Sequence, residues 1–236
     1  MTQPKQPASF HEMLIQMAIH DLRAPLSSIL TGIELTLQPD MSAEDTRRVL
    51  KLCLDSGGKL MRQMESLLDI AHIETGQMPI HAQTQPLQPI IADAVMLLTN
   101  LIEEMHLQVE IHAPSDLPPV FADDHLTRRV LVNLIDNAIH HTPTGTRIHI
   151  DAAHESTTRQ VRVRICDDGS GIPVEQRESI FESYRRPSAQ RRARRGFGWG
   201  LAFCKLAIEA QGGQIAVEDA DGDLRGACFM VSLPTG

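Results

Sequence analysis

The sequence lacks several features that would each point to a particular class of protein. Its four cysteines have no paired spacing of the kind that holds a metal ion, so we expect free thiols in a reducing compartment. Its apolar runs are far shorter than the ~20 residues that cross a bilayer. The start of the chain also has no charged-then-apolar signal layout. The cysteines are Cys53, Cys166, Cys204 and Cys228.

An excess of positive charge is also missing. The formal net charge is −8 and the pI is near 5.7, which argues against a general nucleic-acid binder, whose surface must neutralise phosphates. With 236 residues and 42% hydrophobic content, the chain can bury one large core or two modest ones. We therefore expect a cytoplasmic globular protein whose present segment contacts neither nucleic acid nor membrane. A polar start, residues 1–9, is predicted to be disordered.

Two long amphipathic helices are expected in the first third of the chain. Apolar side chains recur in alternating steps of three and four residues along 10–37 and again along 50–71. Residues 38–42 between them are typical of a helix stop, a turn and an N-cap. We assign 10–76 to an antiparallel helical hairpin. Because one hairpin cannot enclose two broad apolar stripes, we predict a homodimer through residues 10–75 that forms a four-helix bundle.

A second domain is expected over residues 90–236, after a linker rich in Pro and Gln at 77–89. Its pattern alternates between helix and strand, which predicts an α/β sandwich with helices covering one face of a sheet. The predicted helices cover 90–105, 126–141 and 199–210, and the predicted strands cover 108–112, 147–152, 161–166, 214–218 and 228–233.

A histidine and a carboxylate, His20 and Asp21, are adjacent on the first predicted helix. His20 lies off the apolar stripe, so we expect its imidazole to face water. A neutral imidazole is a competent nucleophile near pH 7, and a neighbouring carboxylate can fix its tautomer or take its proton. Pro25 should kink the helix just after the pair. The alternative is an ordinary surface histidine without a chemical role. Motifs further along the chain decide between a nucleophilic and an ordinary histidine.

A pair of asparagines, Asn133 and Asn137, lies four residues apart and hence on one face of the helix predicted over 126–141. Amide oxygens are ligands that Mg²⁺ accepts, usually with water and substrate phosphates completing its shell. The alternative interpretation is the ordinary polar side of a helix.

An aspartate-glycine segment directly follows the strand predicted over 161–166. Gly169 and Gly171 allow the backbone to bend sharply and approach a flat ligand. The carboxylate of Asp167 can accept a hydrogen bond from an exocyclic amine such as that of adenine. By itself this pattern also describes a common turn.

A second glycine-rich segment precedes the last predicted helix. Gly196, Gly198 and Gly200 would expose backbone N–H groups and the positive end of the helix dipole to phosphate. A flexible hinge is the alternative interpretation of the same glycines. Six arginines lie just before it, within residues 184–195. They indicate either a solvated loop or a mobile lid over a triphosphate.

Taken in order, these motifs resemble the kinase core of two-component sensor histidine kinases. That family combines a dimerisation and phosphoacceptor hairpin with an ATP-binding domain of the GHKL type. The resemblance covers about residues 10–234, and its five motifs are individually modest but specific in this order and spacing. The H box, N box, first glycine box, F box and second glycine box correspond to residues 20–25, 133–137, 167–171, 181–184 and 196–201.

The resemblance implies an activity and roles for individual residues. His20 would accept the γ-phosphoryl group of ATP with Asp21 as base, and a response-regulator protein would dock near His20 to receive the group on an aspartate. Asn137 and Asn133 would hold Mg²⁺, and Asp167 would read the adenine amino group. The other residues implied around the nucleotide are His140, His141, Gly169, Gly171, Arg195, Gly196, Gly198, Gly200 and Leu201.

Four residues at three sites depart from the family pattern. His140 and His141 stand where a lysine and a tyrosine are usual, so we expect weaker, pH-dependent charge near the phosphates. Trp199 replaces a leucine and should alter lid packing. Ala24 replaces the threonine or asparagine that positions water, which predicts weak phosphatase activity toward the regulator.

Two alternatives remain at this point. One is a degenerate kinase that serves as a nucleotide-binding dimeric scaffold, which the histidines and Trp199 would favour. The other is a GHKL ATPase of the topoisomerase, mismatch-repair or chaperone type, but those proteins lack an upstream hairpin with an H box. No sensory segment precedes His20, so we expect either the core of a longer kinase or a kinase controlled by a separate protein.

Overall fold

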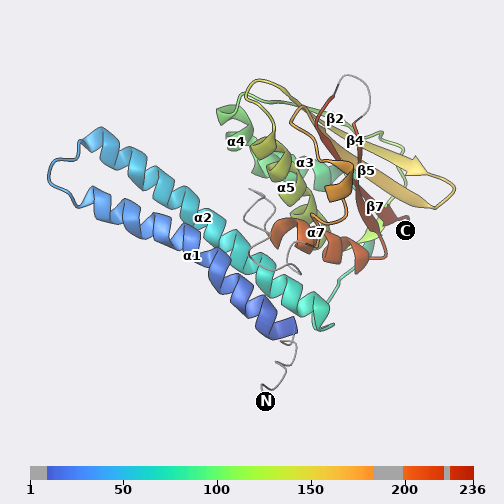
Figure 1. Cartoon of the computed structure of the whole chain (residues 1–236). Helices are drawn as coiled ribbons and strands as arrows, with labels where there is room; N and C mark the ends of the chain where they lie inside the picture. Colours follow the sequence, from blue (N-terminus) through green and yellow to red (C-terminus); the bar gives the residue numbers. More distant parts are fainter. Residues whose placement is uncertain (1–9, 183–198, 221–223) are drawn as a thin grey trace, which may run out of the picture. The chain divides into compact units, whose positions relative to one another are not determined.

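The protein has two compact units, a helical hairpin and an α/β domain (Figure 1). The computed structural model describes residues 10–182, 199–220 and 224–236. The α/β unit comprises Ile70–Ser183 and Gly200–Gly236. None of the helices in the described residues is both long enough and apolar enough to span a membrane. The predicted disordered start, residues 1–9, lies outside the described part.

The hairpin consists of α1 (Phe10–Thr36) and α2 (Ala43–Glu74). Ser42 caps α2, as its position predicted: its Oγ accepts a hydrogen bond from the Asp45 N–H at 3.1 Å and donates to Asp45 Oδ2 at 2.7 Å. Two acidic residues in the first turn of α2 complement the positive end of the helix dipole. The capping pair and the short turn explain why the sequence sufficed to place both helices.

The two helices of the hairpin approach each other closely at Gly32. This glycine is buried, and a Cβ there would collide with Cys53 Sγ, which itself lies 3.6 Å from the Ile29 carbonyl. Many other apolar side chains of the hairpin remain exposed, more than isolated surface residues would account for. They are Ile19, Leu26, Leu30, Ile33 and Leu35 on α1, Leu37 just after α1, and Leu50, Leu52, Leu54, Met61, Met64 and Leu68 on α2.

The α/β unit is built on a five-stranded sheet whose strands match the five predicted from the sequence. In spatial order they are β2 (Gln108–His112), β4 (Arg147–Glu155), β5 (Gln160–Asp167), β7 (Ala227–Pro234) and β6 (Gln214–Asp219). Only β2 and β4 pair in parallel within this sheet. A small second sheet joins β1 (Gln83–Gln85) to β3 (Val120–Ala122).

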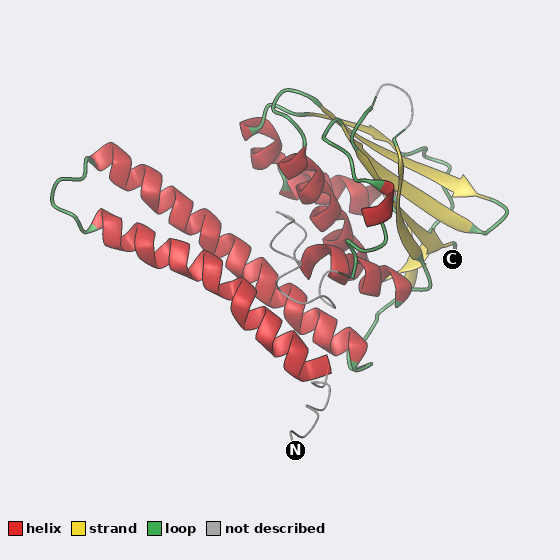
Figure 2. Cartoon of the chain, viewed as in Figure 1, coloured by secondary structure: helices red, strands yellow, loops and turns green. Residues whose placement is uncertain are grey.

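The helices of this unit cover one face of the five-stranded sheet (Figure 2). They are α3 (Gln88–Leu97), α4 (Thr99–Glu104), α5 (Asp124–His141) and α7 (Trp199–Glu209), with a short 3-10 turn η1 (Val174–Gln176). Apolar side chains of α5, such as Leu134 and Ile135, are fully buried, as are Val163 and Ile165 on the sheet. This confirms the predicted fold class, a helical hairpin followed by an α/β sandwich.

Two parts of the fold differ from the prediction. The helix expected over 90–105 is divided into α3 and α4, because Leu98 leaves helical geometry at φ −107° and ψ 6°. The segment 77–89 contains β1 and the start of α3. A three-residue strand has no period to detect, and its partner β3 lies far along the chain.

The prediction of four free thiols was wrong for two of them. Cys166 on β5 is bonded to Cys228 on β7, its register partner in the sheet, whereas Cys53 and Cys204 are free. Sixty-two residues separate the bonded pair, so their spacing in the sequence gives no indication of their pairing. Only the register of two adjacent strands brings them together.

A buried polar cluster joins the start of α5 to the end of α7. Gln211 Oε1 accepts hydrogen bonds from the Asp123 N–H at 2.7 Å and from Thr127 Oγ1 at 3.2 Å, while Gln211 Nε2 donates to the Ala207 carbonyl at 2.8 Å. Asp123 Oδ2 also accepts from the His81 N–H at 2.8 Å. The cluster therefore fixes α5 against α7 and ties the segment before α3 to the same point.

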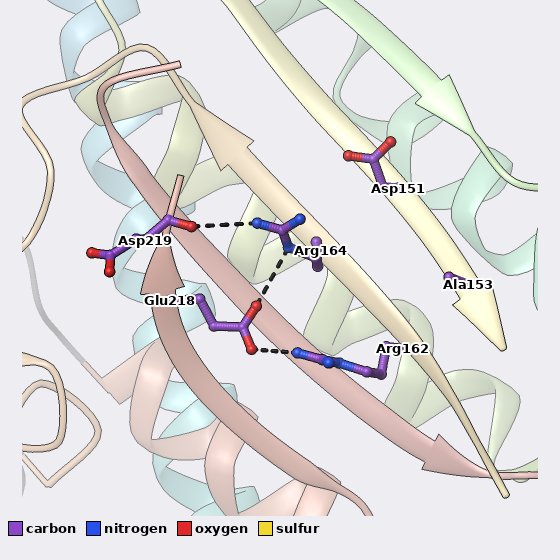
Figure 3. A pocket seen from close by; sticks show the side chains of 6 residues that line it. All are labelled: Asp151, Ala153, Arg162, Arg164, Glu218 and Asp219. Atoms are coloured by element: carbon purple, nitrogen blue, oxygen red, sulfur yellow. Dashed lines mark hydrogen bonds and ion pairs between the residues drawn. The ribbon is translucent and has the colours of Figure 1, made fainter. Parts of the chain in front are cut away.

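The face of the sheet turned away from the helices is lined with charged side chains (Figure 3). Arg162 pairs with Glu218, and Arg164 contacts the same carboxylate at 3.4 Å and the Asp219 carbonyl at 3.3 Å. These arginines already have acidic partners, so this shallow hollow is not suited to a phosphate.

Candidate nucleotide site

Asp167 ends β5 on the helix-covered side of the sheet and is almost completely buried, with 1% of its surface exposed. Its Oδ1 accepts hydrogen bonds from the Gly169 N–H at 2.8 Å and the Ala227 N–H at 3.2 Å. Its Oδ2 is buried and has no hydrogen-bond partner among the described residues. A buried carboxylate oxygen without a donor is costly, so this atom is suited to a ligand N–H group.

The electrostatics of Asp167 follow from this burial. Desolvation raises the pKa of the carboxyl group, and the N–H groups of Gly169 and Ala227, together with His141, partly oppose that rise. Two backbone donors therefore hold one oxygen in place while the other remains available.

Two glycines let the backbone close around this carboxylate. A Cβ on Gly226 would collide with Asp167 and with the Gly169 nitrogen, and the Gly226 N–H donates to the Asp167 carbonyl at 2.9 Å. A Cβ on Gly169 would collide with the carbonyl of His141. Gly171 has a φ of +70°, a conformation that favours glycine. The turn after β5 thus depends on glycine at 169 and 171, as the motif predicted, and on Gly226 as well.

Sequence reasoning missed Gly226 and Ala227. Both hold Asp167 through backbone groups: Ala227 is the first residue of β7, about sixty residues further along the chain, and Gly226 directly precedes it. The available signal was a glycine directly before an apolar strand. It does not indicate which residue of another strand will lie beside that glycine.

The asparagines lie on one face of α5, and both are half-buried. A Cβ on Gly200, in the first turn of α7, would lie 3.4 Å from Asn133 Oδ1. Four residues after Asn137, the carbonyl of His141 lies against Gly169. This face of α5 therefore extends from the start of α7 to the turn that carries Asp167, so the structure brings the predicted N box, first glycine box and Gly200 together.

The two histidines at the end of α5 have different surroundings. His140 Nδ1 lies 2.8 Å from the carbonyl oxygen of Asp136 and 3.5 Å from its Oδ1, so the ring is held by the preceding helical turn. His141 lies beside Gly169 and interacts electrostatically with Asp167. The structure thus places His141 close enough to Asp167 to interact with its carboxylate.

Aromatic side chains pack in the core next to the elements that carry the site. Phe181, the first residue of the predicted F box, is buried and packs edge-on against Phe229 with ring centroids 6.3 Å apart. The guanidinium of Arg129 lies 4.5 Å from the centre of the Phe203 ring, which links α5 to α7. Leu201 is buried in the core, with 4% of its surface exposed.

Several predicted site residues fall where the structure gives no description. Arg195, Gly196 and Gly198, and the arginine-rich stretch 184–195, lie outside the described residues. His20 and Asp21 lie on α1, as predicted, but the side chain of His20 is not among those described.

Comparison with known proteins assigns each of the two units to a protein family. Residues 11–76 match the His Kinase A (phospho-acceptor) domain, and residues 122–236 match the histidine kinase-, DNA gyrase B- and HSP90-like ATPase family. The chain is 36% identical over 234 residues to the adaptive-response sensory kinase SasA of Gloeothece citriformis (strain PCC 7424). The chain belongs to the histidine kinase family.

This histidine kinase also shares its fold with solved relatives. Histidine kinase AdeS of Acinetobacter baumannii has a TM-score of 0.66 at 22% identity, covering 94% of this chain and 97% of AdeS. Full-length ShkA in complex with AMPPNP has a TM-score of 0.65 at 24% identity, covering 95% of this chain and 46% of ShkA. At these identities the likeness concerns the fold alone.

The match to SasA covers 95% of the histidine kinase chain and 58% of SasA. The chain therefore spans little more than half the length of this relative. The family that the five motifs indicated is confirmed, and the C-terminal unit is an ATPase-type domain that uses ATP.

Proposed function

We propose that this histidine kinase transfers the γ-phosphoryl group of ATP to His20 and then to an aspartate of a response-regulator protein. One observation carries the proposal. In an ATPase-type domain, on the same chain as a phospho-acceptor hairpin, the buried Asp167 carboxylate has one oxygen to which no described residue donates a hydrogen bond. That oxygen is suited to the exocyclic amine of adenine, and the Gly169 and Ala227 N–H groups orient it.

The asparagine face of α5 is suited to the metal that accompanies the triphosphate. Asn133 and Asn137 supply amide oxygens, which Mg²⁺ accepts together with water and phosphate oxygens. When bound, the ion would neutralise charge on the phosphates. Gly200 lies next to Asn133, since a Cβ on Gly200 would be 3.4 Å from Asn133 Oδ1. The first turn of α7 is therefore near the same place, where backbone N–H groups can bind a phosphate oxygen. Gly196, Gly198 and Arg195 precede this turn in the chain, and we assign them to the same phosphates.

The chemical step needs a nucleophile and a base. A ring nitrogen of His20 attacks the γ-phosphorus, the bond from phosphorus to the bridging oxygen breaks, and ADP leaves with the electron pair. The imidazole proton passes to Asp21, its neighbour on α1. In the second step a carboxylate oxygen of the regulator displaces the imidazole from phosphorus, and His20 takes up a proton again. Positioning and charge neutralisation account for most of the catalysis in such transfers.

We further propose that the protein is a homodimer through residues 10–75. The exposed leucine, isoleucine and methionine side chains of α1 and α2 would be covered by the same surfaces of a second hairpin, giving a four-helix bundle. The regulator would dock on the bundle near His20.

The test is incubation of the full chain with γ-labelled ATP and Mg²⁺. We expect a protein label that is acid-labile and base-stable, absent in His20→Ala and Asn137→Ala. It should remain in the matched controls His72→Ala, an exposed histidine on α2, and Asn100→Ala, an exposed asparagine on α4.

Two outcomes would contradict the proposal. Steady phosphate release without protein labelling would indicate an ATPase of another GHKL class. Nucleotide binding with neither labelling nor release would indicate the dimeric scaffold.

A further inference from the structure

Arg129 continues the row of polar side chains on α5 that includes the two asparagines. Arg129, Asn133 and Asn137 follow one another at intervals of four residues, so they share one face of the helix. The adjacent Arg128 has a different position, because its Nε lies 3.6 Å from Asp93 Oδ2 on α3. Of the two neighbouring arginines, Arg129 is therefore the one on the face that we assign to the phosphates.

The guanidinium of Arg129 lies against α7. Its Cζ atom is 4.5 Å from the centre of the Phe203 ring, and Phe203 is completely buried. Burial raises the pKa of the neighbouring Cys204 thiol, and the positive charge of Arg129 partly opposes that rise. A guanidinium that packs its flat face on a ring can still donate hydrogen bonds from its edge. The ring therefore fixes the position of the charge and leaves the edge of the group able to bind an anion.

The order of groups along α5 gives the direction in which a bound nucleotide would run. At the C-terminal end of the helix, the His141 carbonyl lies against Gly169, in the turn that carries Asp167 and the adenine site. Eight residues earlier, or about 12 Å along the helix, Asn133 lies next to Gly200, at the phosphate site. Adenine and the γ-phosphate are the two ends of ATP. The γ-phosphate therefore lies toward the N-terminal end of α5.

We propose that Arg129 binds the γ-phosphate and thereby distinguishes ATP from ADP. The inference rests on the proposed function, in which Asp167 binds adenine and the asparagine face binds Mg²⁺ and the phosphates. Arg129 lies one helical turn beyond Asn133, on the side away from the adenine site, so the last phosphate of the nucleotide is the one nearest to it.

Arg129 supplies this face with a charge that the asparagines do not have. Their amides are neutral, whereas an arginine keeps its positive charge in proteins and presents a fork of N–H donors that matches two phosphate oxygens. During phosphoryl transfer, negative charge is spread over the outer oxygens of the γ-phosphoryl group, and a positioned arginine stabilises it. Arg129 should therefore contribute both to the binding of ATP and to the rate of transfer.

The direct test is a calorimetric titration of the full chain with AMPPNP and with ADP, each in the presence of Mg²⁺. Arg129→Met keeps an unbranched apolar stem against Phe203 and removes the charge. Its Kd for AMPPNP should rise roughly tenfold to a hundredfold, the effect of losing hydrogen bonds from a charged donor. Its Kd for ADP should stay the same, because ADP has no γ-phosphate. Arg129→Lys keeps the charge and loses the fork, so its loss for AMPPNP should be smaller and again absent for ADP.

The matched control is Arg128→Met, the same exchange at the neighbouring residue, which should bind both nucleotides as the wild type does. A second measurement is the rate of His20 labelling at saturating ATP. Arg129→Met should lower that rate on the order of a hundredfold even with the site filled, because it removes a donor to charge that develops in the transition state.

Three results would overturn the inference. Arg129→Met or Arg129→Lys could weaken AMPPNP and ADP by the same factor, which would mean that the arginine only shapes the site. The Kd for AMPPNP could be unchanged in Arg129→Met, or Arg128→Met could lose as much affinity for AMPPNP. The proposed function fails separately, and this inference with it, if the wild type binds neither nucleotide. A wild type that labels His20, beside an Arg129→Met variant with unchanged AMPPNP binding, defeats this inference alone.

Discussion

Replacing Asp167 with asparagine changes one buried oxygen and leaves the shape of the side chain intact. The amide oxygen can still accept from the N–H groups of Gly169 and Ala227, but an NH₂ group then takes the place of Oδ2. A donor would face the donating amine of adenine, and one hydrogen bond to a charged acceptor is lost. Such a bond contributes about 1.5–3 kcal/mol, so the Kd for AMPPNP should rise roughly tenfold to more than a hundredfold.

The same substitution should not destabilise the empty protein. Burial raises the pKa of Asp167 in the folded state. A raised folded-state pKa means that the contribution to stability is present below the unfolded pKa and is lost as pH rises through the folded pKa. At pH 7 the wild type therefore bears the cost of a buried charge that Asp167→Asn lacks. The variant should unfold at the same or a higher temperature, and the difference should shrink at acidic pH.

Binding should depend on pH in the opposite sense. As pH falls through the raised pKa of Asp167, a proton on Oδ2 turns the acceptor into a donor, and the wild-type Kd should rise. The Kd of Asp167→Asn should lack this component.

Calorimetric titration with AMPPNP and thermal unfolding, each at neutral and acidic pH, measure both effects. Asp168→Asn is the matched control, since Asp168 is the next residue and pairs with Arg147 at 3.4 Å instead of facing the site. An unchanged Kd in Asp167→Asn, or a fall in unfolding temperature at pH 7, would refute the reasoning. A loss of affinity in Asp168→Asn as large as that in Asp167→Asn would do the same.

Three other substitutions test separate parts of the structure. Gly226→Ala places a Cβ against Asp167 and should weaken AMPPNP binding at least as much as Asp167→Asn does, as titration would show. Gln211→Ala removes the hydrogen bonds between α5 and α7 and should lower the free energy of unfolding by about 1–3 kcal/mol in a denaturant titration. Gly57→Ala adds a Cβ that meets nothing within 4 Å among the residues that the structure describes, so it should raise that free energy by about 1 kcal/mol. A destabilised dimer in Gly57→Ala would instead indicate that a second copy packs there.

Local patterns account for the elements that the sequence predicted well. The hairpin has an uninterrupted three-four apolar period and a capping serine at residue 42. Strands β2, β4 and β5 alternate in polarity over most of their lengths, whereas β6 and β7 are short apolar runs. Both signals lie within one element. The division at Leu98 and the three-residue strand β1 carry no such period, because their geometry depends on packing with distant segments.

The candidate site likewise has residues that the sequence revealed and residues that it did not. His20, Asn133, Asn137 and Asp167 belong to short motifs whose residues are close in sequence, so their types and spacing were visible. The groups that hold Asp167 from β7, and the pairing of the cysteine beside it, depend on the register between β5 and β7. Register between strands sixty residues apart is a property of the whole sheet, and no spacing in the chain encodes it.

Locating the phosphoryl group tests the central claim most directly. The chain has eleven histidines, and the account assigns the group to one of them. After incubation with ATP and Mg²⁺, peptide mapping by mass spectrometry at alkaline pH should find the phosphoryl group on the peptide that contains His20 and place it on that ring. A phosphoryl group on any other residue, or an unmodified His20 in protein that turns over ATP, would contradict the account.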